Sequence, residues 1–148
     1  MRLRLASTIK TAEHARAYLY HGVRNPEDVQ KILTEGFDLT KNRSEWITGY
    51  GVSTFNKPEG VKKFFRNPNI PILKILFDGN MVAPWDAEEA VKPYAPKRGP
   101  AAPWSPRDYN EALIEAGIDA VFLNTSYKGI LEVMIHNIQK IRSIELLG

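Results

Sequence analysis

The spacing of hydrophobic positions predicts three short helices, each introduced by a similar run of polar residues and proline. These runs are residues 25–28, 56–59 and 105–108. In the first and third run a capping Asn or Ser precedes the proline, which suits the first helical position. Acids within each run favour the positive end of a helix. Gly36 and Gly117 predict where the first and third helices end.

Between and after these helices, apolar runs rich in β-branched and aromatic residues predict strands. They cover residues 17–22, 51–55, 70–77, 119–124 and 131–137, with a further strand near 141–147. Strands separated by short helices indicate a single α+β domain over residues 1–148, with a mixed, largely antiparallel core.

One stretch, residues 81–106, follows neither pattern and contains six of the ten prolines. Proline removes a backbone donor and fixes φ, so this stretch is expected to form neither a central strand nor a long helix. Loops of this length are often functional. Trp85 and Trp104 bracket the stretch, and we expect them to pin it to the body through apolar contacts, with stacking on a ligand as the alternative.

Composition changes this picture little: 43% of the 148 residues are hydrophobic and 25% are charged. No apolar run approaches about 20 residues and none follows the basic N-terminus, so we expect no membrane span and no secretory signal. The sequence contains no cysteine, which excludes disulfides, thiolate zinc sites and a cysteine nucleophile and fits a cytoplasmic protein. The net charge of +3 aids approach to polyanions, and the basic clusters at 62–66 and 92–98 are interpreted first as solvated surface.

The histidines are the next candidates for chemistry. His14, His21 and His136 lack a metal-binding spacing, so no metal site is predicted. His14 lies in a polar stretch interpreted as helical and is expected at the surface, whereas His136 is interpreted as a structural histidine on a strand. His21 differs, because it ends an aromatic strand and precedes Gly22, a residue that lets backbone approach a ligand closely. Taken alone, His21 would be interpreted as a hydrogen-bonded histidine at a strand edge.

The order of several motifs changes that interpretation. In chain order they are Tyr20-His21-Gly22, Gly49-Tyr50-Gly51-Val52-Ser53, Phe64-Phe65, the strand 72–77 and Leu131-Glu132-Val133. With this order the chain resembles the ADP-ribosyltransferase superfamily over residues 17–146. Its closing half also resembles the ADP-ribosyltransferase-like domains of phage polyvalent proteins. The resemblance implies a fold of two small antiparallel sheets, split by a cleft, with short flanking helices.

The resemblance also implies NAD as co-substrate and assigns roles to single residues. His21 corresponds to the histidine that hydrogen-bonds the adenine-side ribose in the histidine-tyrosine-glutamate pattern of poly(ADP-ribose) polymerase-like enzymes. Gly22 corresponds to the glycine whose backbone holds the nicotinamide amide, and Glu132 to the catalytic glutamate. Further candidate NAD-binding residues are Tyr20, Tyr50, Ser53, Phe64 and Phe65. For Phe64 and Phe65 the alternative is core packing on an amphipathic helix.

Two positions depart from the family patterns. Ser53 stands where the first pattern has tyrosine, and Ser53-Thr54 is similar to the arginine-serine-glutamate branch instead. That branch begins with arginine, so the chain is of a mixed histidine-serine-glutamate type. Ile130 replaces the acid or glutamine that arginine-modifying enzymes carry two residues before the glutamate, which disfavours arginine as the acceptor.

The implied chemistry agrees with these residue types. Cleavage of the nicotinamide–ribose bond passes through an oxocarbenium-like ribose, which an adjacent carboxylate such as Glu132 stabilises. Nicotinamide leaves as a neutral molecule, so one carboxylate can suffice, and aromatic walls favour the flat pyridinium. We therefore expect a mono-ADP-ribosyltransferase whose acceptor is a protein, a nucleic acid or a small molecule. The alternatives are an NAD-binding or ADP-ribose-binding module without turnover, a structural part of a larger particle, and a toxin that hydrolyses NAD.

Overall fold

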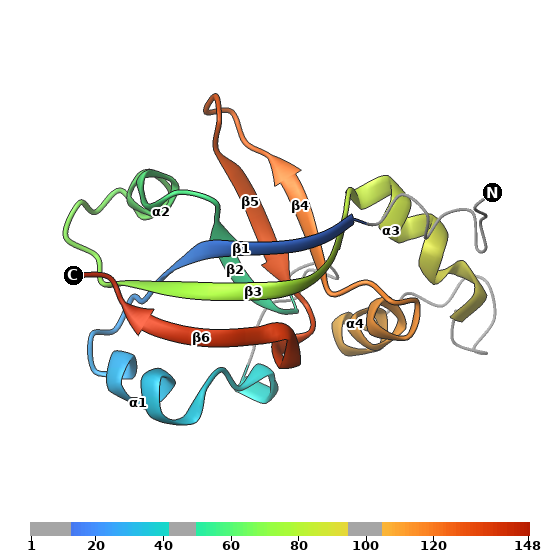
Figure 1. Cartoon of the computed structure of the whole chain (residues 1–148), viewed down its shortest axis with the longest axis horizontal. Helices are drawn as coiled ribbons and strands as arrows, with labels where there is room; N and C mark the ends of the chain where they lie inside the picture. Colours follow the sequence, from blue (N-terminus) through green and yellow to red (C-terminus); the bar gives the residue numbers. More distant parts are fainter. Residues whose placement is uncertain (1–12, 42–49, 95–104) are drawn as a thin grey trace.

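The computed structural model describes residues 13–41, 50–94 and 105–148 (Figure 1). Its strands are β1 (Glu13–Gly22), β2 (Val52–Phe55), β3 (Ile72–Val82), β4 (Ala120–Asn124), β5 (Leu131–Ile135) and β6 (Ile141–Leu146). Its α-helices are α1 (Asp28–Glu35), α2 (Pro58–Phe65), α3 (Pro84–Val91) and α4 (Pro106–Glu115). Single 3₁₀ turns lie at η2 (Leu39–Lys41), η4 (Lys92–Tyr94) and η5 (Ile138–Lys140).

The strands form one sheet that closes on itself. Its order is β1-β2-β5-β4-β3, and β3 returns to β1 through a continuous antiparallel ladder from Glu13↔Met81 to Gly22↔Ile72. The pair Tyr20↔Phe55 joins β1 to β2. The end of β3 joins β4 in parallel at Val82↔Val121. Strand β6 lies outside this ring, antiparallel to the first half of β3.

The prediction of two split antiparallel sheets is therefore wrong, although the structure is α+β. The reason lies in the length of β3, which runs for 11 residues instead of ending at Phe77. Its first half pairs with β6 and its last two residues pair with β4, so one strand connects the two groups of strands. A strand advances about 3.3 Å per residue, so the five extra residues carry the ladder about 16 Å further.

Contacts from outside the strand explain why β3 continues past Phe77. A Cβ atom on Gly79 would lie 2.7 Å from Oδ2 of Asp119, so the lack of a side chain lets Asp119 approach the strand. The backbone N–H of Asn80 donates to the same Oδ2 at 2.8 Å. This carboxylate is 39 positions distant in sequence, which is why no local pattern predicted the continuation.

The core consists of three apolar clusters. The inside of the ring is filled by Leu19, Val52, Ile75, Phe77, Ala120, Val133 and Ile135. A second cluster lies beneath α2 and contains Phe55, Val61, Ile70, Ile72 and Ile130. A third holds α3 and α4 against β4 and includes Val82, Ala87, Val91, Leu113 and Ile118. Each fully buried aliphatic side chain contributes about 1.5–3 kcal/mol, so all three clusters are needed to hold the ring and its helices together.

The predicted helix starts are confirmed for α2 and α4, whereas α1 begins two residues later than predicted, at Asp28 rather than Pro26. Ser105 caps α4, since its Oγ accepts from the backbone N–H of Asp108 at 3.0 Å. Pro58 begins α2 behind Lys57. In α1 the side chain of Asn25 does not cap the helix; its main-chain oxygen accepts from Asp28 instead, at 2.9 Å.

Within the stretch 81–106, which shows no helical pattern in sequence, residues Pro84 to Val91 form the short helix α3, because Ala87, Ala90 and Val91 bury one face against the third cluster. Two other local predictions are wrong. Trp85 is 68% exposed and does not anchor the stretch, and Trp104 lies outside the described residues. His14 lies on β1 rather than on a helix, but it is exposed as expected and hydrogen-bonds Asp78.

Candidate functional site

Ser53 on β2 is hydrogen-bonded to both other predicted residues: to Glu132 on β5 through its side chain, and to His21 on β1 through its main chain. Glu132 on β5 pairs with Phe55 on β2, and Phe55 pairs in turn with Tyr20 on β1. The hydroxyl of Ser53 donates to Oε2 of Glu132 at 3.2 Å. Nδ1 of His21 lies 2.7 Å from the main-chain oxygen of Ser53. The Ser53 hydroxyl thus binds the carboxylate, and the Ser53 main-chain oxygen binds the imidazole.

The strand register explains the contact between Ser53 and Glu132. Side chains two positions apart on a strand share a face, so Ser53 and Phe55 lie on the same face of β2. Glu132 pairs with Phe55, so its side chain lies on this face as well. This is the outer face of the ring, since Val52 and Thr54 on the other face are buried inside it. Glu132 is half-buried, and Ser53 is its only hydrogen-bond partner among the described residues. No described residue forms a hydrogen bond with Oε1 of Glu132, so this oxygen can bind a ligand.

The hydrogen bond of His21 fixes the tautomer of its ring. A carbonyl oxygen only accepts, so Nδ1 of His21 must carry the proton that it donates to Ser53. Burial lowers the pKa of His21 below its ordinary value, and the bond to Ser53 only partly opposes this effect. The imidazole is consequently neutral near pH 7, and Nε2 is a hydrogen-bond acceptor. The ring of Phe37 packs edge-on against it, with centroids 5.1 Å apart.

Gly22 has a packing role that the sequence did not reveal. A Cβ atom at this position would lie 2.6 Å from both the Phe65 ring and Val61, so the glycine allows α2 to press onto the end of β1. The prediction that a ligand approaches this backbone stays a prediction. Phe65 is half-buried in this contact, and the guanidinium of Arg24 lies 4.6 Å from the centre of its ring.

The other predicted aromatic residues are placed differently from one another. Phe64 is 56% exposed, and its ring lies 5.6 Å from that of Phe55, the residue paired with Glu132. Tyr20 is half-buried beneath α2. Tyr50 is half-buried as well, and its main-chain oxygen accepts from Nδ1 of His136 at 3.0 Å. Phe64 is therefore the aromatic side chain that is both exposed and next to the Glu132 pairing.

A cavity of about 620 Å³ is lined in part by Phe37, the residue whose ring contacts His21. It is lined by α1, by residues 36–40 and by Ile138, and it combines the apolar Ile32 and Phe37 with the carboxylates Glu35 and Asp38. The sequence analysis missed it because residues 37–40 show no helix or strand periodicity. A volume in this range accommodates a small organic ligand.

His136 is structural, as the sequence indicated, and lies outside this site. It is fully buried, and its Nδ1 is shared between Oδ1 of Asn110 at 2.7 Å and the oxygen of Tyr50. Burial lowers the pKa of His136 to about 4. Among the described residues, no group of three His, Cys, Asp or Glu side chains that could hold a metal ion occurs.

Comparisons with known proteins do not identify a family for this chain. No protein-family model matches the sequence, and no curated protein matches it. Within the described ranges, no helix has the length and apolar character needed to cross a membrane.

Proposed function

We propose that the protein is an NAD-dependent ADP-ribosyltransferase, in which Glu132 acts on the bond between nicotinamide and ribose. One observation carries the proposal. Ser53 binds a half-buried carboxylate through its hydroxyl at 3.2 Å and a neutral histidine through its main-chain oxygen at 2.7 Å. The proposal rests on these side chains and on their order along the chain. It does not rest on the split-sheet fold, which the structure lacks.

The reaction needs a negative charge where the ribose becomes positive. When the glycosidic bond breaks, its electron pair goes to the ring nitrogen of nicotinamide, which leaves as a neutral base. The ribose then carries oxocarbenium character, which the carboxylate of Glu132 stabilises electrostatically. The acceptor forms the new bond to the same ribose carbon, and its proton passes to Glu132.

Ser53 and His21 serve positioning in this scheme. By donating to Oε2, Ser53 holds one oxygen of Glu132 and directs the other away from the sheet. His21 offers the lone pair on Nε2 to a sugar hydroxyl, which a protonated imidazole could not do.

The test is the release of nicotinamide from NAD, measured by chromatography, together with the transfer of label from NAD carrying a radioactive adenylate phosphate. We expect release by the wild-type protein and a loss of about 100- to 1,000-fold in Glu132→Gln. Glu115→Gln is the matched control, because Glu115 is an exposed carboxylate at the end of α4. Equal release by all three proteins, or no release by any, would sink the proposal.

Label transfer separates the possible acceptors. Label on a macromolecule identifies a transferase, whereas release with no labelled product other than free ADP-ribose identifies NAD hydrolysis. Calorimetry completes the comparison: heat of NAD binding without release would identify a binding module and contradict the proposed turnover.

A further inference from the structure

Helix α2 and the loop between β4 and β5 form one continuous surface, here called the α2–loop surface (residues 56–66 and 125–130). Asn56 connects them: its Nδ2 donates to the oxygen of Gly129 at 3.2 Å, and its Oδ1 accepts from the N–H of Leu131 at 2.9 Å. Further along, Nζ of Lys63 lies 4.7 Å from the centre of the Tyr127 ring. The two segments are therefore held at a fixed separation.

This surface is basic, and its cations are not neutralised. Lys57, Lys62, Lys63, Arg66 and Lys128 lie on the two segments, with Glu59 as the single acid. None of these five cations forms an ion pair with a carboxylate within the described ranges. Several cations elsewhere have acidic partners: Arg16 and Arg142 approach Asp78, and Arg107 approaches Glu111. The contrast indicates that the α2–loop cations are available to an external anion.

Two aromatic rings are exposed among these cations. Phe64 is 56% exposed and Tyr127 is 48% exposed. Phe64 is held in place by Phe55 and Phe65, whose ring centres lie 5.6 Å and 5.1 Å away. Exposed rings held rigidly between cations provide stacking platforms for bases, while the cations contact the phosphates.

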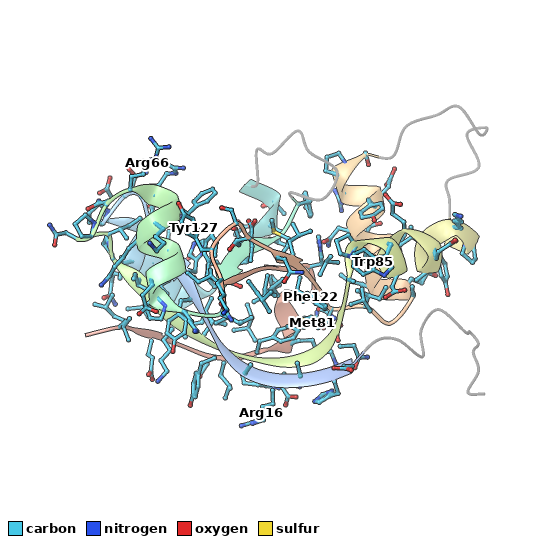
Figure 2. All side chains as sticks on the ribbon, turned by 90° about the horizontal axis from the view of Figure 1, so that it is seen from above. Arg16, Arg66, Met81, Trp85, Phe122 and Tyr127 are labelled. Carbon is cyan, nitrogen blue, oxygen red and sulfur yellow. The ribbon has the colours of Figure 1, made fainter. Side chains whose placement is uncertain are left out.

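The backbone at Arg66 adds an independent observation. Arg66 ends α2 with φ 53° and ψ 37°, a left-handed conformation that glycine adopts without strain. It is the one non-glycine residue with positive φ in the described part of the chain. A strained arginine at this position extends the row of cations beyond the helix end, and Figure 2 shows Arg66 and Tyr127 on the same side of the molecule, away from Trp85.

We propose that the α2–loop surface binds single-stranded nucleic acid and that this strand is the acceptor of the ADP-ribose. The second part rests on the proposed function. The surface borders the site, since Phe64 contacts Phe55 and Phe55 pairs with Glu132. A strand lying across Phe64 would bring a base near the carboxylate, where a base nitrogen bonds to the ribose carbon and gives its proton to Glu132. A duplex hides its base faces, and the Asp and Glu side chains of an acidic peptide have no rings to stack, so both fit the exposed aromatics less well.

Binding is tested without NAD, by fluorescence anisotropy with labelled single-stranded DNA and RNA of about 12 nucleotides and with the matching duplex. We expect the single strands to bind more tightly than the duplex. The double variant Lys63→Glu with Arg66→Glu should lose at least about tenfold in affinity and show a shallower dependence on salt. Lys92→Glu with Arg107→Glu changes the charge equally on exposed residues away from this surface and should bind several-fold more tightly than the first pair.

The aromatic contribution is tested separately. Phe64→Ala and Tyr127→Ala should each lower affinity by about 5- to 150-fold with an unchanged salt slope, and circular dichroism confirms that both variants are folded. Equal losses in the two charge-reversed pairs, tighter binding of the duplex, or full displacement of the strand by poly-glutamate would overturn the proposal.

The two proposals fail in different ways. Strand binding without nicotinamide release would contradict the proposed enzyme and leave the binding surface intact. Nicotinamide release without strand binding would contradict both parts of the α2–loop proposal and leave the proposed enzyme intact.

Discussion

Two polar clusters adjoin β2 and β5, one around His136 and one around Ser53, and they differ in burial and in how many hydrogen bonds their side chains form. Around His136 the polar groups are buried and face inward: Nδ1 lies between Asn110 and the oxygen of Tyr50, and Nδ2 of Asn110 donates back to the oxygen of His136 at 3.2 Å. Around Ser53 the groups are half-buried. Glu132 has one described hydrogen bond, from Ser53, and His21 has one, to the Ser53 oxygen.

The difference separates a structural role from a chemical one. Asn110 connects α4 to the end of β5, so its side-chain bonds hold two parts of the fold together. Loss of such a group leaves buried partners unsatisfied and costs stability. The Ser53 cluster connects strands that already share a ladder, so its side-chain bonds add little to the fold. A carboxylate kept there with unused bonding capacity is more useful to a ligand than to the core.

The largest expected effect is the loss of nicotinamide release in Glu132→Gln. Glu132→Gln keeps the shape of the side chain and still accepts from Ser53, but it removes the charge that stabilises the ribose. Nicotinamide release should fall by about 100- to 1,000-fold, while the free energy of unfolding in urea changes by less than about 0.5 kcal/mol. A loss of several kcal/mol in the free energy of unfolding would instead show that Glu132 has a structural role.

The His136 cluster should respond to pH. Its pKa of about 4 lies below the ordinary value of 6.5, so the unfolded chain binds a proton between these values that the folded chain does not. Stability should therefore fall as pH drops from about 6.5 to 4, by about 3 kcal/mol from this residue, and His21 contributes in the same direction. Urea unfolding at a series of pH values measures this loss. An NMR titration of His136 with a midpoint near 6.5 in the folded protein would contradict it.

Asn110→Ala should lower stability and leave nicotinamide release unchanged, the opposite of what is expected for Glu132→Gln. It removes the acceptor of His136 Nδ1 and the donor to the His136 oxygen in a buried place, so stability should fall by about 2–3 kcal/mol. At a temperature where the variant is fully folded, nicotinamide release per folded molecule should stay within about twofold of the wild type. A release rate lowered as strongly as in Glu132→Gln would show that the two clusters are coupled.

The smallest effect is expected for Ser53→Ala. Loss of the hydroxyl frees the orientation of Glu132 without removing its charge, so nicotinamide release should fall by about tenfold. Ser53→Thr keeps a hydroxyl at the same position and should recover part of the rate, if the added methyl is tolerated on the half-buried face. The comparison is made from rates at saturating NAD; a rate unchanged in Ser53→Ala would remove serine from the site.

Much of the local structure could be predicted because its signals are local. The starts of α2 and α4 follow from a proline and its neighbours, and five of the six strands begin within two residues of their predicted positions. The closure of the ring could not be predicted, because it depends on Asp119 contacting Gly79 and Asn80 across 39 positions. Helix α3 was missed because the prolines of its stretch concealed the small apolar face of Ala87 and Ala90.

The candidate site shows the same division. His21, Ser53 and Glu132 were singled out from their order along the chain, and the structure shows a hydrogen bond from Ser53 to Glu132 and one from His21 to the Ser53 main-chain oxygen. Phe37 and the cavity that it lines in part were missed, since they follow α1 in a segment without periodicity. The contact between Gly22 and Phe65 was missed because it depends on how α2 docks onto β1, which neither segment encodes alone.

The most direct test of the central claim is a crystal structure of Glu132→Gln with NAD bound, in which turnover no longer destroys the ligand. The account predicts the nicotinamide-side ribose within hydrogen-bond distance, about 3 Å, of the amide introduced at position 132, with a sugar hydroxyl donating to Nε2 of His21. NAD bound elsewhere on the protein, with position 132 and His21 both uncontacted, would contradict it.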